Sequence, residues 1–156
     1  MNYSEKALEH FRNPHNVGKI ENPDGIGKVG NIVCGDVMWI YIKVKENKKK
    51  EEFIQDIKFE TFGCVAALAT SSALTDLAKG KTLEKALRIK NEDIINFLGD
   101  LPPIKIHCSL LAIDGLSEAI YDYLSKKGKD IPEKLKLRHG KALRELEIIE
   151  EKNKKE

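Results

Sequence analysis

The chain has little cysteine, a single tryptophan, a single glutamine and no long apolar run. Its three cysteines are an odd number, so they cannot all be paired in disulfides within one chain. No segment approaches the ~20 apolar residues that a membrane-spanning helix needs. The first residues carry neither the apolar core of a secretory signal nor an Arg-rich transit sequence. We therefore expect a cytoplasmic protein, whose thiols stay reduced and are open to metal binding, catalysis or burial.

A strong net charge is absent as well. The formal net charge is +2, with basic and acidic residues mixed along the chain. Such a chain has no strong field for nucleic acid or for an anionic membrane, and neither is expected as a partner. At 156 residues, with 41% hydrophobic and 33% charged residues, the composition is that of one globular domain with a sizeable core.

Hydrophobic periodicity predicts three β-strands early in the chain. Apolar residues alternate from Met38 to Val44, which is typical of a half-buried strand. Further strands are expected at roughly 27–33 and 53–62, on either side of this one. The connections between the three strands are short, which favours an antiparallel meander.

The rest of the chain has mainly helical periodicity. Apolar residues recur at intervals of three and four, while glycines, prolines and capping residues mark the ends. Helices are expected at residues 3–11, 64–80, 82–88, 91–98, 110–127 and 133–152. Because the strands come first and most helices follow, we expect an α+β fold in which helices cover one face of a small three-stranded antiparallel sheet.

The meander makes a geometric prediction about two of the cysteines. The first strand ends at Cys34, the second begins beside Asp36, and the third ends at Cys64. In an antiparallel meander these three positions share one rim of the sheet. Gly35 and Gly63 flank them and allow the backbone to approach a ligand closely.

The third cysteine belongs to the segment LPPIKIHCS at residues 101–109. This segment places Lys105, His107 and Cys108 directly ahead of a long amphipathic helix. A buried cysteine can simply act as a small hydrophobic residue. Three cysteines at element boundaries, none of them inside an apolar stripe, favour a shared metal site instead. That Cys108 reaches the same rim is an inference that spacing alone does not give.

The histidines outside this segment have no comparable context. We expect His10, His15 and His139 at the surface. The stretch at residues 13–31 contains six glycines and prolines and is expected to form a loop-rich arm.

Several motifs together resemble the iron–sulfur cluster assembly scaffolds of the IscU/NifU amino-terminal family. The longest is LPPIKIHCS at residues 101–109. The others, spread over residues 2–126, are YSEK at 3–6, NP at 13–14, NVG at 16–18, GN at 30–31, CGD at 34–36, TFGC at 61–64 and SS at 71–72. The resemblance implies a scaffold domain over residues 1–126, followed by a charged helical extension over residues 127–156.

The resemblance also implies a set of ligands. It assigns cluster binding to Cys34, Cys64 and Cys108, with Asp36 or His107 as the fourth ligand. The cluster would be [2Fe–2S], with [4Fe–4S] left open, and Zn²⁺ could occupy the same donors.

Three residues of the segment have expected roles other than ligation. Cys108 is the candidate acceptor of a persulfide sulfur, with His107 as proton shuttle. Lys105 would favour the thiolate and offset the negative charge of the cluster.

The function implied is a scaffold and carrier, not an enzyme: it builds clusters from iron and desulfurase-derived sulfur and transfers them to apo-proteins. The partners implied are a cysteine desulfurase and apo iron–sulfur proteins. A ferredoxin, a heat-shock chaperone at residues 101–105 and a homodimer remain open. So do two other functions, a zinc-binding regulatory module of the desulfurase and a sulfurtransferase that uses Cys108 and His107.

Overall fold

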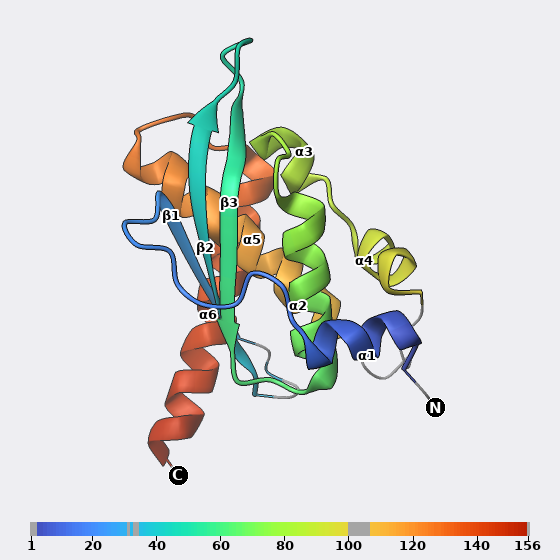
Figure 1. The fold of residues 1–156 in the computed structure, drawn as a ribbon. Helices are drawn as coiled ribbons and strands as arrows, with labels where there is room; N and C mark the ends of the chain where they lie inside the picture. Colours follow the sequence, from blue (N-terminus) through green and yellow to red (C-terminus); the bar gives the residue numbers. More distant parts are fainter. Residues whose placement is uncertain (1–2, 31, 33–34, 100–106, 156) are drawn as a thin grey trace.

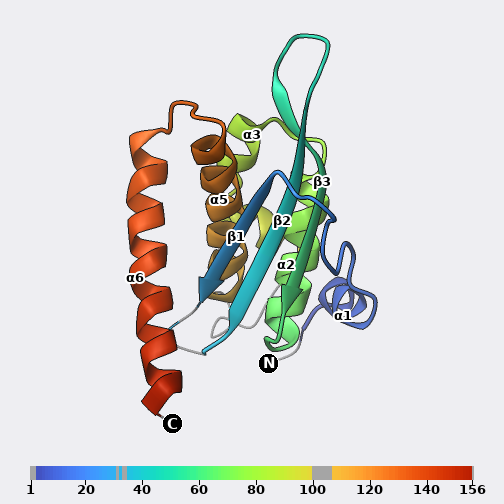
Figure 2. The same ribbon diagram turned by 90° about the vertical axis from the view of Figure 1, so that its left-hand side faces the viewer.

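The computed structural model describes residues 3–30, 32, 35–99 and 107–155, except for the side chains of residues 107, 108, 153 and 155. The elements in chain order are α1 (Glu5–Arg12), β1 (Gly25–Gly30), β2 (Val37–Glu46), β3 (Glu52–Thr61), α2 (Val65–Ala78), α3 (Leu83–Leu87), α4 (Asn91–Leu98), α5 (His107–Lys126) and α6 (Glu133–Lys155). Figures 1 and 2 show their arrangement.

The three strands form an antiparallel sheet in the order β1-β2-β3, as the meander predicts. Gly30 pairs with Val37, and Met38 pairs with Thr61, so the end of β1, the start of β2 and the end of β3 share one rim. β1 begins at Gly25, two residues earlier than expected, because its pairing with β2 extends back to Ile42.

One face of the sheet carries the core. Met38, Ile40 and Ile42 are fully buried on that face, as their alternation predicts. Helices α2 and α5 pack against it (Figure 2), and β3 contributes the buried Ile57 and Phe59. The α+β class with helices on one face of a three-stranded sheet is therefore confirmed.

A β-bulge interrupts the alternation in β3. Lys43 pairs with Asp56 and Val44 with Ile54, so Gln55 is an extra residue between two pairs. As a result Ile54 joins the buried face, where a strict period of two from Ile57 would have placed it on the other side.

Helix α5 lies directly over β1. A methyl group at Gly25 would collide with the carbonyl oxygen of Ala119, and one at Gly27 with that of Gly115. Moving along β1 toward the rim thus means moving toward the N-terminus of α5. The helix consequently begins, at His107, at the same end of the sheet as the rim.

Helix α6 packs on α5 and along β1, with Leu135, Ala142 and Ile149 buried. Lys28 of β1 forms an ion pair with Glu150 at 3.1 Å. The charged extension is thus helical, as expected, and continues to Lys155 instead of ending near residue 152. The division into two parts at residue 126 stays a prediction. In the structure, α6 contributes to the same hydrophobic core as α5.

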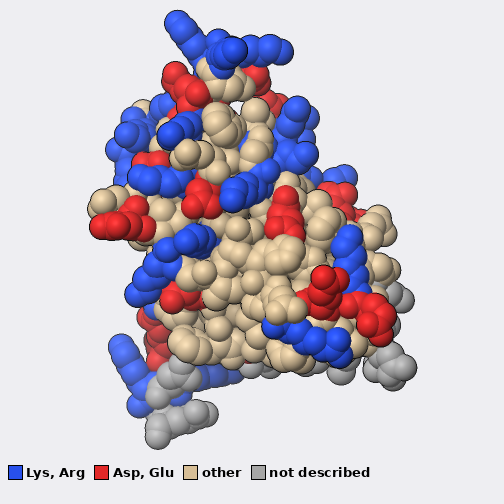
Figure 3. Space-filling view, viewed as in Figure 1, with Lys and Arg blue, Asp and Glu red and all other residues tan. Residues whose placement is uncertain are grey.

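The surface mixes both signs of charge. On the face shown in Figure 3, basic and acidic side chains alternate around an uncharged area, and basic ones gather over the β2–β3 hairpin, where residues 48–50 are exposed lysines. Among the helices that the structure describes, none combines the length and apolar character that crossing a bilayer would require.

Candidate metal and cluster site at the rim of the sheet

Asp36 lies at the rim, immediately before β2. Gly35 precedes it with a φ of 74°, a conformation that glycine adopts without strain. The Asp36 side chain is half-buried, and its Oδ2 atom is buried with no hydrogen-bond partner among the described residues. A buried polar atom in this state points to an ion or water that would satisfy it.

The carboxylate of Asp36 rests against Gly63, the residue before Cys64. A methyl group at Gly63 would lie 2.9 Å from Asp36 Oδ2 and 2.5 Å from the Cβ atom of Ala67. Any larger side chain at this position would clash. Only a glycine therefore lets the chain after β3 pack this closely against the carboxylate. Cys64 caps α2 in an extended conformation, with its carbonyl accepting the N–H of Leu68 at 3.1 Å.

The structure thus brings Asp36 and Cys64 together, as the meander predicts. The backbone of His107 and Cys108 forms the first turn of α5, which begins at the same end of the sheet. Cys34, Lys105 and the rest of residues 101–106 lie outside the described residues, as do the side chains of His107 and Cys108. Their predicted roles therefore remain predictions.

The donors at this rim suit a soft or borderline metal. A thiolate favours zinc and iron–sulfur clusters, while a carboxylate is a harder ligand that such centres hold less firmly. Cys64 also occupies the N-terminus of a helix, where the helix dipole favours negative charge. The rim can therefore hold a metal and compensate the charge of its ligands.

The profile of the NifU-like N terminal domain matches residues 2–130. The chain belongs to this family. The resemblance seen in its motifs is thereby confirmed.

Relatives of this NifU-like domain include two proteins named as iron–sulfur cluster assembly scaffold proteins. IscU 1 of Archaeoglobus fulgidus is 59% identical over 127 residues, which cover 81% of this chain and 80% of that protein. IscU of Escherichia coli (strain K12) is 50% identical over 130 residues, covering 81% of this chain and 98% of that protein.

Solved structures share the fold. A protein of Fervidobacterium islandicum, described as a scaffold for iron–sulfur cluster assembly in the SUF system, matches with a TM-score of 0.60 and 27% identity, over 76% of this chain and 96% of that one. A NifU-like N-terminal protein from Brucella abortus gives 0.62 at 19% identity, over 78% and 94%. The second likeness speaks for the fold alone.

An exposed aromatic ring marks the rim of this NifU-like domain. Phe62 is 88% exposed, and its ring meets that of Trp39 edge-on at 6.3 Å. An exposed phenylalanine so close to Cys64 is a feature that binding surfaces for other proteins use.

The expectation that His10, His15 and His139 lie at the surface is wrong for His10. His10 is only 5% exposed, and burial, followed by the charge of His15, lowers its pKa. His139 is half-buried on α6, stacked on Tyr121 at 3.7 Å and hydrogen-bonded to Glu118. His15 is exposed, as expected.

Sequence reasoning also missed a side-chain cluster formed by His10, His15 and Asp76. The first two are close in sequence, which was the only available signal. Asp76 lies far away in sequence on α2, and nothing in the pattern of that helix marks it.

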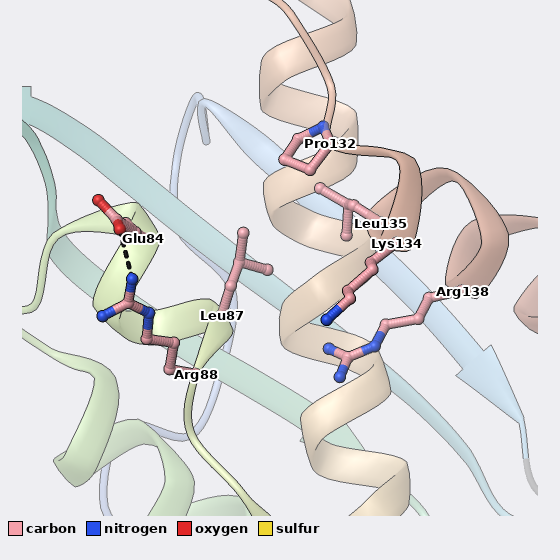
Figure 4. Close-up of a pocket in the computed structure, with 7 residues that line it drawn as sticks. All are labelled: Glu84, Leu87, Arg88, Pro132, Lys134, Leu135 and Arg138. Atoms are coloured by element: carbon pink, nitrogen blue, oxygen red, sulfur yellow. Dashed lines mark hydrogen bonds and ion pairs between the residues drawn. The ribbon is translucent and has the colours of Figure 1, made fainter.

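A hollow of about 440 Å³ lies at the opposite end of the domain from the rim, between α3 and the start of α6 (Figure 4). Its lining includes Arg88, Lys134 and Arg138, but Arg88 is paired with Glu84 and Arg138 donates to Ser117. Two of these cations are thus engaged by the protein itself, and the residues that line the hollow include neither Asp36 nor Cys64.

Proposed function

We propose that this chain assembles iron–sulfur clusters at its rim and passes them to apo-proteins. The observation that carries the proposal is the buried Oδ2 of Asp36, packed against the residue before Cys64 and without a hydrogen-bond partner among the described residues. A carboxylate in this state, packed against the residue before a cysteine, suits a bound metal. Membership of the NifU-like family and the names of the IscU relatives support the same role.

The proposed ligands are Cys34, Cys64 and Cys108, with Asp36 or His107 in the fourth position. Iron–sulfur clusters usually have four thiolate ligands. A set with one weaker ligand would hold a [2Fe–2S] cluster less firmly, which suits a protein that must release it. The same donors could bind Zn²⁺ tetrahedrally, and we propose zinc as the ion that occupies them when no cluster is being built.

Sulfur would arrive by thiol exchange. The Cys108 thiolate attacks the outer sulfur of a persulfide on the desulfurase, a new S–S bond forms on Cys108, and the desulfurase cysteine leaves as a thiolate. His107 would accept the proton of the Cys108 thiol, and Lys105 would offset the negative charge. Reduction of that sulfur to sulfide requires electrons, a role that suits a ferredoxin.

The chain would then be a scaffold and carrier and not an enzyme, working where thiols stay reduced, as in the cytoplasm. Its partners would be a cysteine desulfurase and apo iron–sulfur proteins. The exposed Phe62 beside the rim supports docking of a partner there. Residues 101–105 are the segment proposed to bind a heat-shock chaperone.

Anaerobic reconstitution tests the proposal. The full chain is incubated with ferrous iron, cysteine and a cysteine desulfurase, and absorption in the visible range is followed. We expect a chromophore that forms on the scaffold and then moves to apo-ferredoxin. A variant with Cys64→Ser serves as the negative control.

Two other outcomes would contradict it. Protein that stays colourless and retains only zinc would be a regulatory module of the desulfurase. Sulfur turnover to a small thiol without a chromophore would make it a sulfurtransferase.

A further inference from the structure

A second group of metal-ligating side chains lies away from the rim, where the N-terminal helix and the segment after it pack on α2. His10 comes from the last turn of α1, His15 from the following segment and Asp76 from α2. One donor atom from each of the three lies within 4.8 Å of the other two.

The protein fixes His10 firmly. Its Nδ1 atom lies 2.7 Å from the hydroxyl oxygen of Ser72, and its ring meets the edge of Phe97 at 5.7 Å between centroids. The rings of His10 and His15 lie 4.7 Å apart. Burial lowers the pKa of His10, which favours the neutral imidazole, the form that binds metals.

The other two donors are oriented by neighbours as well. The backbone N–H of His15 donates to Ser72 Oγ at 2.8 Å, and His15 Nδ1 lies 2.6 Å from Asp76 Oδ2. The second carboxylate oxygen, Asp76 Oδ1, accepts from Asn16 Nδ2 at 3.3 Å. Hydrogen bonds to residues outside the ligand set, here Ser72 and Asn16, hold imidazole and carboxylate ligands in position in metal sites.

We propose that His10, His15 and Asp76 bind a divalent transition-metal ion. Two imidazoles and one carboxylate form a borderline donor set that Zn²⁺ and Fe²⁺ both accept, with solvent completing the coordination. The ion would take the place of the proton between His15 Nδ1 and Asp76 Oδ2, and the imidazole would keep one proton, on Nε2. This inference is independent of the function proposed for the rim.

Only small movements are needed. Donor atoms in a tetrahedral zinc site lie about 3.3 Å apart, given metal–nitrogen bonds of about 2.0 Å. The His15–Asp76 pair would open slightly from 2.6 Å, while the widest separation would close from at most 4.8 Å. The side chains of His15 and Asp76 are 50% and 27% exposed, so they have room to move and the ion has a path from solvent.

The site is separate from the rim. Asp76 lies about three turns along α2 from Cys64, roughly 18 Å at 1.5 Å per residue. An ion at this position cannot be shared with Cys64. It would instead fasten α1 and the His15 segment to α2, because each of the three ligands comes from a different part of the chain.

The test needs a protein whose cysteines cannot bind the metal. The full chain with Cys34→Ser, Cys64→Ser and Cys108→Ser, checked for folding by circular dichroism, is titrated with Zn²⁺ and, without oxygen, with Fe²⁺. We expect one ion per chain and a rise in Tm of roughly 5–10 °C at a hundredfold excess over Kd.

Variants assign the ligands. In the same background His15→Gln and Asp76→Asn should each weaken binding by about tenfold or more, since each removes one ligand of three. The matched control is His139→Gln, which also removes a histidine hydrogen-bonded to a carboxylate but lies on α6. It should leave the affinity unchanged.

Unmodified protein provides a second measurement if the thiol-free chain does not fold. Titrated with Co²⁺, it should show nitrogen- and oxygen-ligated cobalt beside any thiolate-ligated cobalt, and His15→Gln should abolish only the first signal. The proposal is overturned if neither Zn²⁺ nor Fe²⁺ binds below millimolar concentration. It is also overturned if affinity survives in both His15→Gln and Asp76→Asn, since the pair would then be an ordinary hydrogen bond.

Discussion

Asp36 presents a carboxylate oxygen that is buried at the rim and receives no hydrogen bond from the described residues. In a protein without a metal at this position, burying such an oxygen costs free energy, because its bonds to water are lost and not replaced. A residue kept in this state is better explained by what it binds than by what it stabilises. Because it lies close to Gly63 and Cys64, Asp36 is the first residue to mutate in a test of this site.

We predict that Asp36→Ala keeps the fold, retains the cluster several-fold longer and slows its transfer to apo-ferredoxin. The carboxylate is the ligand most easily displaced from a sulfur-rich centre, and His107 or another donor would take the vacated position. The measurement is anaerobic cluster loss to a chelator and to the acceptor. Faster loss would make Asp36 an ordinary stabilising ligand, and unchanged rates would show that it takes no part.

Gly63→Ala should disturb the same site by a steric route. The added methyl group would stand 2.9 Å from Asp36 Oδ2 and 2.5 Å from the Cβ of Ala67, so the carboxylate and the start of α2 must shift. We expect a loss of stability of about 1–3 kcal/mol and a lower yield of reconstituted cluster.

Chemical denaturation measures the stability, and a double mutant provides the control. In Asp36→Ala/Gly63→Ala the carboxylate is gone, so part of the stability lost in Gly63→Ala should return. Strict additivity of the two single effects would mean that the methyl group and the carboxylate do not interact.

At the scale of elements, the packing of α5 on β1 depends on residues without side chains. We predict that Gly27→Ala destabilises the protein by about 1–3 kcal/mol, because a methyl group there would run into the backbone of α5 at Gly115 and Ala119. Gly140→Ala is the comparison: its added methyl group meets only the far end of the Arg144 side chain at 3.6 Å. In a helix interior that change should stabilise by up to about 1 kcal/mol.

Urea unfolding of both variants separates the effect of the steric clash at Gly27 from any effect that a Gly→Ala substitution has by itself. Equal effects at the two positions would mean that α5 can withdraw from β1 at little cost.

Two acidic residues of α5, Asp114 and Glu118, lie where the helix packs on α6, and ionising them there costs free energy. Burial, followed by the negative charge of Glu145, raises the pKa of Asp114, while Lys141 and Arg138 act in the opposite direction. Burial also raises the pKa of Glu118, against the effect of its hydrogen bond with His139. The folded protein therefore holds these protons more tightly than the unfolded chain does.

Asp114→Asn should consequently stabilise the protein at neutral pH. A raised pKa favours folding below the ordinary value near 3.8, and this contribution is lost as the pH rises through the folded-state pKa. The variant cannot ionise, so its advantage should be present at pH 7 and disappear in acid. Unfolding free energies measured from pH 3.5 to pH 8 test this, and an advantage that does not change with pH would exclude ionisation as the cause.

For the molecule as a whole, the sequence predicts the parts whose cause is local. Alternation from Met38 to Val44 gives β2 and its buried face, and short connections give the meander. The meander in turn brings Asp36 and Cys64 to one rim, since it depends only on strand direction. Helix ends follow as well, as at Ser4, whose side chain accepts the N–H of Ala7 at 3.0 Å.

What the sequence could not give depends on contacts between distant residues. The bulge at Gln55 leaves the alternation looking regular, yet it moves Ile54 to the buried face. The N-cap of α4 is Lys90, and Asn91, the first residue of the helix, accepts a hydrogen bond from Ser109 of α5. Such a partner exists only once the helices have packed.

The cluster around His10 has the same origin. Ser72 is separated from it by 62 positions, and only the packing of α1 on α2 turns a histidine expected at the surface into a buried one. The position of α5 at the rim could be predicted only in part. The glycines at positions 25, 27 and 115 indicate that another element packs closely there, but the sequence does not identify that element as α5.

Both margins of the small sheet are already occupied. Along β3, residue 54 exchanges hydrogen bonds with residues 80 and 81, and Phe59 does so with residues 16 and 18. Along β1, the N–H of Ile26 donates to Asp122 at 2.9 Å, and α6 packs beside the strand. A further strand finds little backbone to pair with at either margin. Copies of this chain should therefore resist joining their sheets edge to edge through backbone hydrogen bonds, and any dimer they form must use side-chain contacts elsewhere.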